Sequence, residues 1–257
     1  MCPSIKILFQ YILNLYFDKI NKFNEEILMA FNPADFVIEE PKSIPVVLLL
    51  DTSYSMNGNN INTLNKAVET MIESFKKAET METFIKLSII TFGSENGVDL
   101  HTELTEVSKI NFQPLSVNGA TPMGTAFKMA KAMIEDKSIF KGRDYRPTII
   151  LLSDGAPTDD WKTPLNDFIS NGRSSKCDRM AVSIGGEGRE PLDKFIEGCE
   201  NPLFYAEDAS KLIDEFKKIT MSVTMRTKSV NKNQIINISN ELDGKDIDEI
   251  DFDDFKI

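Results

Sequence analysis

The chain has 257 residues, 41% of them hydrophobic, and its formal net charge is −11. This length fits one α/β domain with additional terminal segments. The hydrophobic share suffices for a substantial core, which excludes a wholly disordered chain. Because an acidic protein has no general affinity for phosphates, nucleic acid is not an expected partner.

The N-terminal segment, residues 1–31, differs in composition from the rest of the chain: it contains six aromatic residues, and its apolar positions have near-helical spacing. We expect an N-terminal extension that forms a helix. Two interpretations of its role remain. It is either an upstream addition without function, or an amphipathic helix that docks on a partner or a membrane surface. The longest uncharged run there, residues 7–17, has 11 residues, whereas a membrane span needs about 20. No membrane span is therefore expected.

Residues 45–224 alternate between apolar runs and apolar stripes of helical spacing. The continuous run at 46–50 is typical of a strand that is buried on both faces. In chain order, we predict strands at 46–50, 86–92, 97–103, 148–153, 180–185 and 203–206. Helices are predicted at 60–77, 122–135, 160–171, 190–197 and 210–223. This alternation predicts an α/β domain with a doubly wound, mostly parallel central sheet flanked by helices.

The last segment, residues 225–257, is expected to be an acidic and largely disordered tail. Residues 240–257 alone carry eight carboxylates and two lysines. Either the tail only adds solubility, or its carboxylates occupy a binding site on the same chain. The three cysteines are widely spaced and form no CxxC pair, so a reducing compartment, the cytoplasm, is the expected location.

Three oxygen-rich segments adjoin predicted strands and helices. Residues 51–55 and 153–159 come at the ends of two buried strands, and residues 119–124 lead into a helix. In open α/β sheets, ligands bind at the carboxyl ends of the strands. Singly, each hydroxyl or carboxylate could instead cap a helix or stabilise a turn.

Two carboxylates and three hydroxyls in these segments form a donor set for a hard cation. They are Asp51, Ser53, Ser55, Thr121 and Asp154. The set contains no histidine and no thiolate, and Mg²⁺ suits it best because that ion keeps several waters and needs few protein ligands. Mn²⁺ and Ca²⁺ are the alternatives.

The motifs DTSYSM, GATPMGTAF and LLSDGAPTD, in this order, resemble the metal-ion-dependent adhesion site (MIDAS) of the von Willebrand factor A domain. The resemblance covers about residues 45–223 and implies a Rossmann-like fold. It also implies that Ser53, Ser55 and often Thr121 bind the ion directly, that Asp51 and Asp154 act mostly through water, and that a partner protein's carboxylate completes the shell. Tyr54 stands where many members have glycine, at a position that does not bind the ion.

The second and third motifs, together with the segment FKKITMSV, resemble the bacterial tellurium-resistance-associated branch of this family. That resemblance implies a stress-response or tellurite-resistance setting in the cytoplasm, with kinase-like or phosphatase-like partner proteins.

The expected function is a divalent-metal-dependent protein-binding module that is not an enzyme. The alternative is an enzyme of metal-dependent phosphoryl transfer or hydrolysis. The only histidine, His101, lies on a predicted edge strand. The sequence has no GxSxG nucleophile motif, so serine-hydrolase catalysis has little support. It also has no GxxxxGK[ST] phosphate loop, so nucleotide hydrolysis is not expected.

Overall fold

The computed structural model describes residues 14–23, 41–94, 96–186 and 188–236. The chain divides into two compact units, Met1–Glu40 and Pro41–Ile257. In the first unit, residues 14–23 are helical and their side chains are exposed, while the rest of the expected extension 1–31 lies outside the described residues. No described helix combines the length and the hydropathy that a membrane crossing requires.

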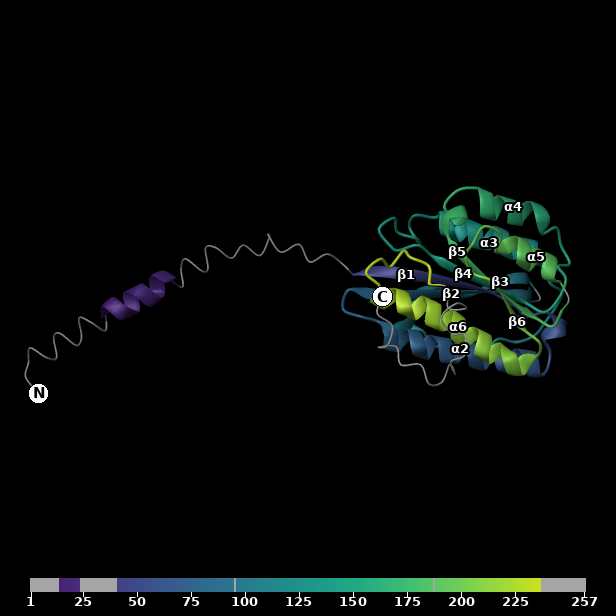
Figure 1. The fold of residues 1–257 in the computed structure, drawn as a ribbon, viewed down its shortest axis with the longest axis horizontal. Helices are drawn as coiled ribbons and strands as arrows, with labels where there is room; N and C mark the ends of the chain where they lie inside the picture. The colour runs from purple at the N-terminus through teal and green to yellow at the C-terminus, as the bar shows by residue number, and fades with distance from the viewer. Residues whose placement is uncertain (1–13, 24–40, 95, 187, 237–257) are drawn as a thin grey trace, which may run out of the picture. The chain divides into compact units, whose positions relative to one another are not determined.

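A six-stranded sheet forms the centre of the second unit, with strand order β3-β2-β1-β4-β5-β6 (Figure 1). The strands are β1 (Lys42–Asp51), β2 (Thr83–Ser94), β3 (Gly97–Glu106), β4 (Thr148–Ser153), β5 (Asp178–Ile184) and β6 (Leu203–Ala206). Neighbouring strands run parallel except β2 and β3, which are antiparallel. The predicted doubly wound, mostly parallel sheet is therefore confirmed.

Helices cover both faces of this sheet (Figure 1). One face carries α2 (Asn59–Ala78) and α6 (Ala209–Lys228), and the other carries α3 (Met123–Glu135), α4 (Lys162–Ser170) and α5 (Arg189–Phe195). Short 3₁₀ turns are η2 (Tyr54–Met56), η3 (Val107–Lys109) and η4 (Ser174–Lys176). Because side chains alternate along a strand, β1 supplies both layers of the core and is fully buried along its apolar run.

Three phenylalanines, one from each of α3, α4 and α5, pack against one another. The ring centroids of Phe127, Phe168 and Phe195 lie 5.7–6.1 Å apart, and each ring is buried. Rings at such separations attract one another beyond the effect of their buried area. This packing holds the three helices in fixed places above the sheet.

The order of the strands places a crevice between β1 and β4. After β1 the chain crosses by α2 to β2 on one side, and after β3 it crosses by α3 to β4 on the other side. The order of strands thus reverses between β1 and β4, which pair directly. In open α/β sheets this reversal point is where ligands bind, beyond the carboxyl ends of the strands.

Strand β1 begins earlier than predicted. β1 starts at Lys42, whereas the sequence predicts a domain from residue 45 and a strand from residue 46. Pro45 pairs with Lys86 of β2 inside the strand. Proline is rare in a paired strand because it has no N–H to donate, which is why the sequence alone suggests a later start.

The last helix also ends later than the predicted residue 223. α6 continues to Lys228, and Arg226 is only 1% exposed. Its guanidinium donates to Thr148 Oγ1 (2.6 Å) and to the carbonyl oxygens of Arg146 (2.7 Å) and Lys232 (3.0 Å). The first part of the expected tail 225–257 is therefore packed on the domain, because an arginine with three acceptors can be buried.

The packed segment reaches residue 236. The Ser222 hydroxyl donates to the carbonyl oxygen of Ile236 at 2.5 Å, and Ile236 is 6% exposed. The acidic residues 240–257 lie outside the described part of the chain.

Candidate metal centre

The predicted site residues belong to three loops at the carboxyl edge of the sheet. Asp51 is the last residue of β1, and Asp154 follows β4, the neighbouring strand. Thr121 precedes α3, which begins at Met123. We call residues 51–58 the first site loop, 118–122 the second and 154–161 the third.

Backbone hydrogen bonds join the three site loops. From the second loop, the Asn118 N–H donates to the carbonyl oxygen of Thr52 at 2.9 Å, and the Gly119 carbonyl accepts from the Tyr54 N–H at 3.2 Å. The second and third loops are joined because the Thr158 N–H donates to the carbonyl oxygen of Thr121 at 2.9 Å. Segments far apart in the sequence therefore form one continuous rim.

Hydroxyls and carboxylates from the first and third loops contact one another. The Ser55 hydroxyl donates to Asp154 Oδ1 at 2.7 Å, and Ser53 Oγ lies 2.9 Å from Ser55 Oγ. Asp51 Oδ1 accepts the Ser53 N–H at 2.9 Å, and Asp51 Oδ2 accepts the Ser153 hydroxyl at 2.5 Å. Four of the five predicted residues are thus brought together. Ser153, which belongs to the oxygen-rich segment 153–159 but not to the five predicted ligands, supports the site by donating to Asp51.

Thr121 lies in the second loop, and its side chain is 6% exposed. Its N–H donates to Thr158 Oγ1 at 3.1 Å, so both backbone groups of Thr121 are held by Thr158. Within the described residues, no hydrogen bond connects the Thr121 hydroxyl with the other four predicted residues. The structure thus fixes the backbone of Thr121 at this rim.

The site has a buried floor and an open mouth. Asp51 is fully buried and Ser53 is 2% exposed, whereas Ser55 is exposed and Tyr54 is 68% exposed. Met56 is fully buried and anchors the short turn η2 that carries these exposed residues. Of the first site loop, Tyr54 and Ser55 are thus accessible to a ligand from solvent.

Asp51 is a buried carboxyl that is held by donors and has no cationic partner among the described residues. Burial raises its pKa to about 6, the Ser153 and Ser53 hydrogen bonds lower it, and the nearby Asp154 raises it further. Burial disfavours the charged form of a carboxyl, and a neighbouring cation favours it. This environment suits a bound positive ion.

The donors at this edge are a mixture of carboxylates and hydroxyls. In the described part of the chain, no group of three or more His, Cys, Asp or Glu side chains is arranged so that it could hold a metal ion by itself. A cation held here would therefore depend on the serine hydroxyls as well as on Asp51 and Asp154. Hard cations such as Mg²⁺ accept such oxygen donors.

Three glycines let other backbone segments approach the site loops. At each of them, an added Cβ atom would come closer to backbone atoms than real Cβ atoms do. The pairs are Gly93 with Thr52 and Ser53, Gly124 with Asp160, and Gly188 with Gly155. Gly93 and Gly188 also have positive φ angles. Their role depends on segments that meet only in the folded chain, so nothing in the sequence marked Gly93 or Gly188 as part of the site.

Asp159 attaches the third loop to the start of α3. Its carboxylate accepts the N–H groups of Gly124 and Thr125, both at 2.8 Å, and the Thr125 hydroxyl at 2.9 Å. Because the first N–H groups of a helix lack partners inside the helix, a carboxylate there is stabilising. Asp159 thus fixes the helix that comes after the second loop.

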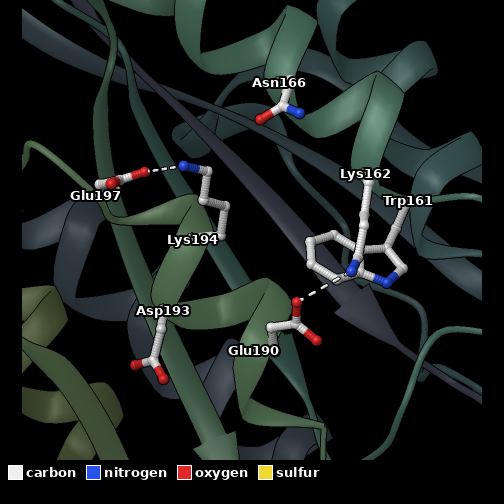
Figure 2. A pocket seen from close by; sticks show the side chains of 7 residues that line it. All are labelled: Trp161, Lys162, Asn166, Glu190, Asp193, Lys194 and Glu197. Atoms are coloured by element: carbon white, nitrogen blue, oxygen red, sulfur yellow. Dashed lines mark hydrogen bonds and ion pairs between the residues drawn. The ribbon is translucent and has the colours of Figure 1, made fainter.

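A separate pocket of about 640 Å³ lies between α4 and α5 (Figure 2). Its lining residues are Trp161, Lys162, Asn166, Glu190, Asp193, Lys194 and Glu197. Both lysines are paired, Lys162 with Glu190 at 3.2 Å and Lys194 with Glu197. None of the five predicted metal ligands lines this pocket.

Comparison with known families identifies the fold. The model of the von Willebrand factor type A domain matches residues 46–218, which is well over half of the chain and contains all five predicted ligands. This chain belongs to the von Willebrand factor type A family. Domains of this family commonly act as metal-dependent protein-interaction modules. No curated protein matches the sequence.

Solved structures share the von Willebrand factor A fold at low sequence identity. The ArnB paralog VWA2 from Sulfolobus acidocaldarius is 18% identical, with a TM-score of 0.52 over 72% of this chain and 46% of that one. Proximal thread matrix protein 1 from the mussel byssus, with a zinc-occupied MIDAS motif, is 16% identical, with a TM-score of 0.54 over 72% and 46%. The pilus adhesin SpaC from Lactobacillus rhamnosus GG is 14% identical, with a TM-score of 0.60 over 74% and 31%. The chain spans less than half the length of these solved proteins.

Proposed function

We propose that this von Willebrand factor A domain binds a divalent cation at the candidate metal centre and, through the cation, a carboxylate of a partner protein. The ligand set is Asp51, Ser53, Ser55, Thr121 and Asp154. The observation that carries the proposal is the convergence of two serine hydroxyls and two carboxylates, from loops at the ends of two neighbouring strands, on one crevice.

The spacing of the hydroxyls suits a small cation. Ser53 Oγ and Ser55 Oγ lie 2.9 Å apart. In an octahedron with Mg²⁺–oxygen bonds of about 2.0–2.1 Å, neighbouring oxygens are separated by about 2.9 Å. The longer bonds of Ca²⁺, about 2.3–2.6 Å, would place neighbouring oxygens farther apart. The two hydroxyls are hydrogen-bonded to each other at this distance, and the same separation is compatible with adjacent positions around the smaller ion.

We assign Mg²⁺ as the ion, with Mn²⁺ as the nearest substitute and Ca²⁺ as a poorer one. Mussel proximal thread matrix protein 1 holds zinc in its MIDAS motif. Zinc and magnesium form bonds of similar length to oxygen. All-oxygen donors, however, suit magnesium and manganese better than zinc, which is usually bound through histidine and cysteine.

Each residue of the proposed site has a separate task. The hydroxyls of Ser53 and Ser55 face the crevice as neutral ligands, and Asp51 and Asp154 supply the negative charge. Ser153 and the Ser53 N–H orient the Asp51 carboxylate. A bound divalent cation would supply an open coordination position that a carboxylate oxygen can take from water. The exposed mouth beside Tyr54 leaves room for that partner.

We further propose that the domain binds and does not catalyse. A hydrolytic or phosphoryl-transfer site needs a general acid, base or nucleophile next to the metal. His101 lies on the edge strand β3, where its ring contacts Phe112 and its Nδ1 contacts Thr102 Oγ1. The cytoplasmic location, the tellurite-resistance setting and the kinase-like or phosphatase-like partners stay predictions from the resemblance of the motifs.

The proposal is tested by titrating Mg²⁺ and Mn²⁺ into metal-free protein and its variants. We expect one saturable site, weakened by about 10–100-fold in Asp51→Ala and in Asp154→Ala, because residues that orient and neutralise a metal site have effects of this size. The Asp160→Asn variant is the matched control, since it removes a charge from the same loop while its amide oxygen still accepts the Lys162 N–H.

Two outcomes contradict the proposed function. Unchanged cation affinity in both carboxylate variants would remove the metal centre from these residues. Metal-dependent hydrolysis of phosphate esters that is lost in Ser53→Ala would favour the enzyme instead.

A further inference from the structure

Arg189 follows a glycine that is packed against the third site loop. It is the first residue of α5, and the residue before it, Gly188, is packed against the backbone of Gly155 in the third site loop. A Cβ atom built on Gly155 would in turn lie 3.7 Å from Ser55 Oγ. The backbone at the start of α5 is therefore in contact with the loop that carries Asp154.

The Arg189 side chain rests on an aromatic ring. Its guanidinium carbon lies 5.9 Å from the ring centroid of Tyr205, a residue of β6 that is 44% exposed. Arg189 itself is exposed. A guanidinium within about 6 Å of a ring centroid is attracted to the ring, and its N–H donors match the geometry of a carboxylate.

The neighbouring carboxylate of Glu190 does not pair with Arg189. The next residue, Glu190, points to Lys162 and is paired with it at 3.2 Å (Figure 2). Among the residues that the structure describes, Arg189 forms no ion pair. The start of α5 therefore presents a guanidinium that lies near Tyr205 and has no ion-pair partner among the described residues.

We propose that Arg189 is a second anchor for the partner and binds a carboxylate next to the one that reaches the metal. This inference rests on the proposed function and specifies the partner: an acidic segment with two acidic side chains, one for the cation and one for Arg189. Tyr205 is the positioning residue, because it holds the guanidinium in place before binding and so reduces the entropy that is lost on binding.

The test uses the full chain loaded with Mg²⁺ and two fluorescent peptides of equal length. One peptide has a single glutamate among glycines and serines, and the other has two glutamates separated by glycine. We expect Arg189→Ala to lower the affinity for the two-glutamate peptide by roughly tenfold, which is the effect of losing one hydrogen-bonded charge pair. The affinity for the single-glutamate peptide should not change. Arg189→Lys should restore only part of the affinity because lysine cannot bind a carboxylate in bidentate fashion.

Two further variants separate positioning from net charge. Tyr205→Leu keeps Arg189 but removes its platform, and we expect it to weaken only the two-glutamate peptide. Lys194→Ala removes a positive charge from the same helix, where Lys194 is paired with Glu197, three residues further along the chain (Figure 2). This control should leave both peptides unchanged.

The outcomes distinguish this inference from the proposed function. Equal losses for both peptides in Arg189→Ala, or no loss for either, would overturn the role of Arg189. If the single-glutamate peptide still binds when a chelator has removed the metal, the proposed function is wrong. If neither peptide binds the Mg²⁺-loaded wild type, both proposals are wrong. Tighter peptide binding by a chain that ends at residue 236 would make the chain's own acidic tail the occupant and would contradict an outside partner.

Discussion

Gly188 supports the third site loop because it has no side chain. Its φ angle is +68°, and an added Cβ would meet the carbonyl group of Gly155 and the nitrogen of Ala156. Residues other than glycine rarely adopt such backbone angles. A side chain at this position would therefore push residues 154–156 and move Asp154 away from Ser55.

We expect Gly188→Ala to weaken Mn²⁺ binding by about tenfold, the lower end of the effects of supporting residues at metal sites, and to destabilise the fold by about 1–3 kcal/mol. Gly186→Ala is the control, since Gly186 has no positive φ angle and an added Cβ would have no neighbour within 4 Å. Calorimetric titration of both variants measures the affinity. Equal affinities for the two would contradict the supporting role of Gly188.

A second residue, Asp178, makes stability depend on pH. It is 1% exposed, its Oδ1 accepts the Asn201 amide at 3.0 Å, and its Oδ2 has no hydrogen-bond partner. Burial raises its pKa to about 6, although the charge of Arg226 favours the carboxylate. Since the unfolded pKa is about 3.9, the native state holds the proton more strongly. Stability should fall as the pH rises from about 4 to about 6.

We therefore expect the Asp178→Asn variant to gain stability relative to the wild type across this pH interval, by about 3 kcal/mol for a shift of about two units. Asp51 titrates in both proteins, so the difference between them isolates Asp178. Urea unfolding at a series of pH values measures it. Parallel stability curves for the two proteins would show that burial does not raise this pKa.

At the scale of elements, the cap of α3 connects helix stability to the metal centre. Asp159 caps α3 from the third site loop, and Asp208 caps α6 in the same way through the N–H groups of Ser210 and Lys211. We expect Asp159→Ala and Asp208→Ala each to cost about 1 kcal/mol of stability. Only the first should also weaken cation binding, because only Asp159 lies in a site loop.

Thermal melting and metal titration of the same two variants check this difference. Asp208→Ala serves as the control for a lost cap. Comparable losses of cation affinity in both variants would contradict the connection through α3, as would unchanged affinity in both.

The strand and helix positions could largely be predicted because apolar runs and stripes define them. β4 is found at the predicted 148–153, for example. The exceptions have identifiable causes. Pro45 obscured the start of β1. Arg226 made the end of α6 look like the beginning of a polar tail, because the sequence does not show that the guanidinium of Arg226 has three hydrogen-bond acceptors in the fold.

The site could be predicted in part. Asp51, Ser53, Ser55 and Asp154 stand next to buried strands in the sequence, so the carboxyl edge of the sheet brings them together. The role of Ser153 and the pairing of Arg189 with Tyr205 depend on contacts between distant segments. Such contacts arise from the complete fold and carry no local sequence signal.

At the scale of the whole molecule, residues 226–236 of the second unit pack against the amino edge of the sheet. Arg226 reaches the start of β4, and the Asn233 side chain accepts the Arg146 N–H at 2.7 Å. Cutting the chain after residue 224 would remove the last turn of α6 and leave the partners of Arg226 without donors. Buried acceptors without partners are costly.

We expect a chain of residues 41–236 to melt cooperatively at the temperature of the full chain. A chain of residues 41–224 should melt at a clearly lower temperature or fail to fold. Differential scanning calorimetry compares the two. If 41–224 were as stable as 41–236, the segment after residue 224 would be a tail, as the sequence alone suggests.

Anomalous X-ray diffraction from crystals soaked in Mn²⁺ can show directly whether the serine hydroxyls bind a divalent cation. We expect one strong manganese peak at the carboxyl edge of β1 and β4, about 2.1–2.2 Å from both Ser53 Oγ and Ser55 Oγ, close to the bond length of Mg²⁺. The peak should be absent in crystals of Ser53→Ala. A peak elsewhere on the molecule, or none at saturating Mn²⁺, would contradict the metal centre.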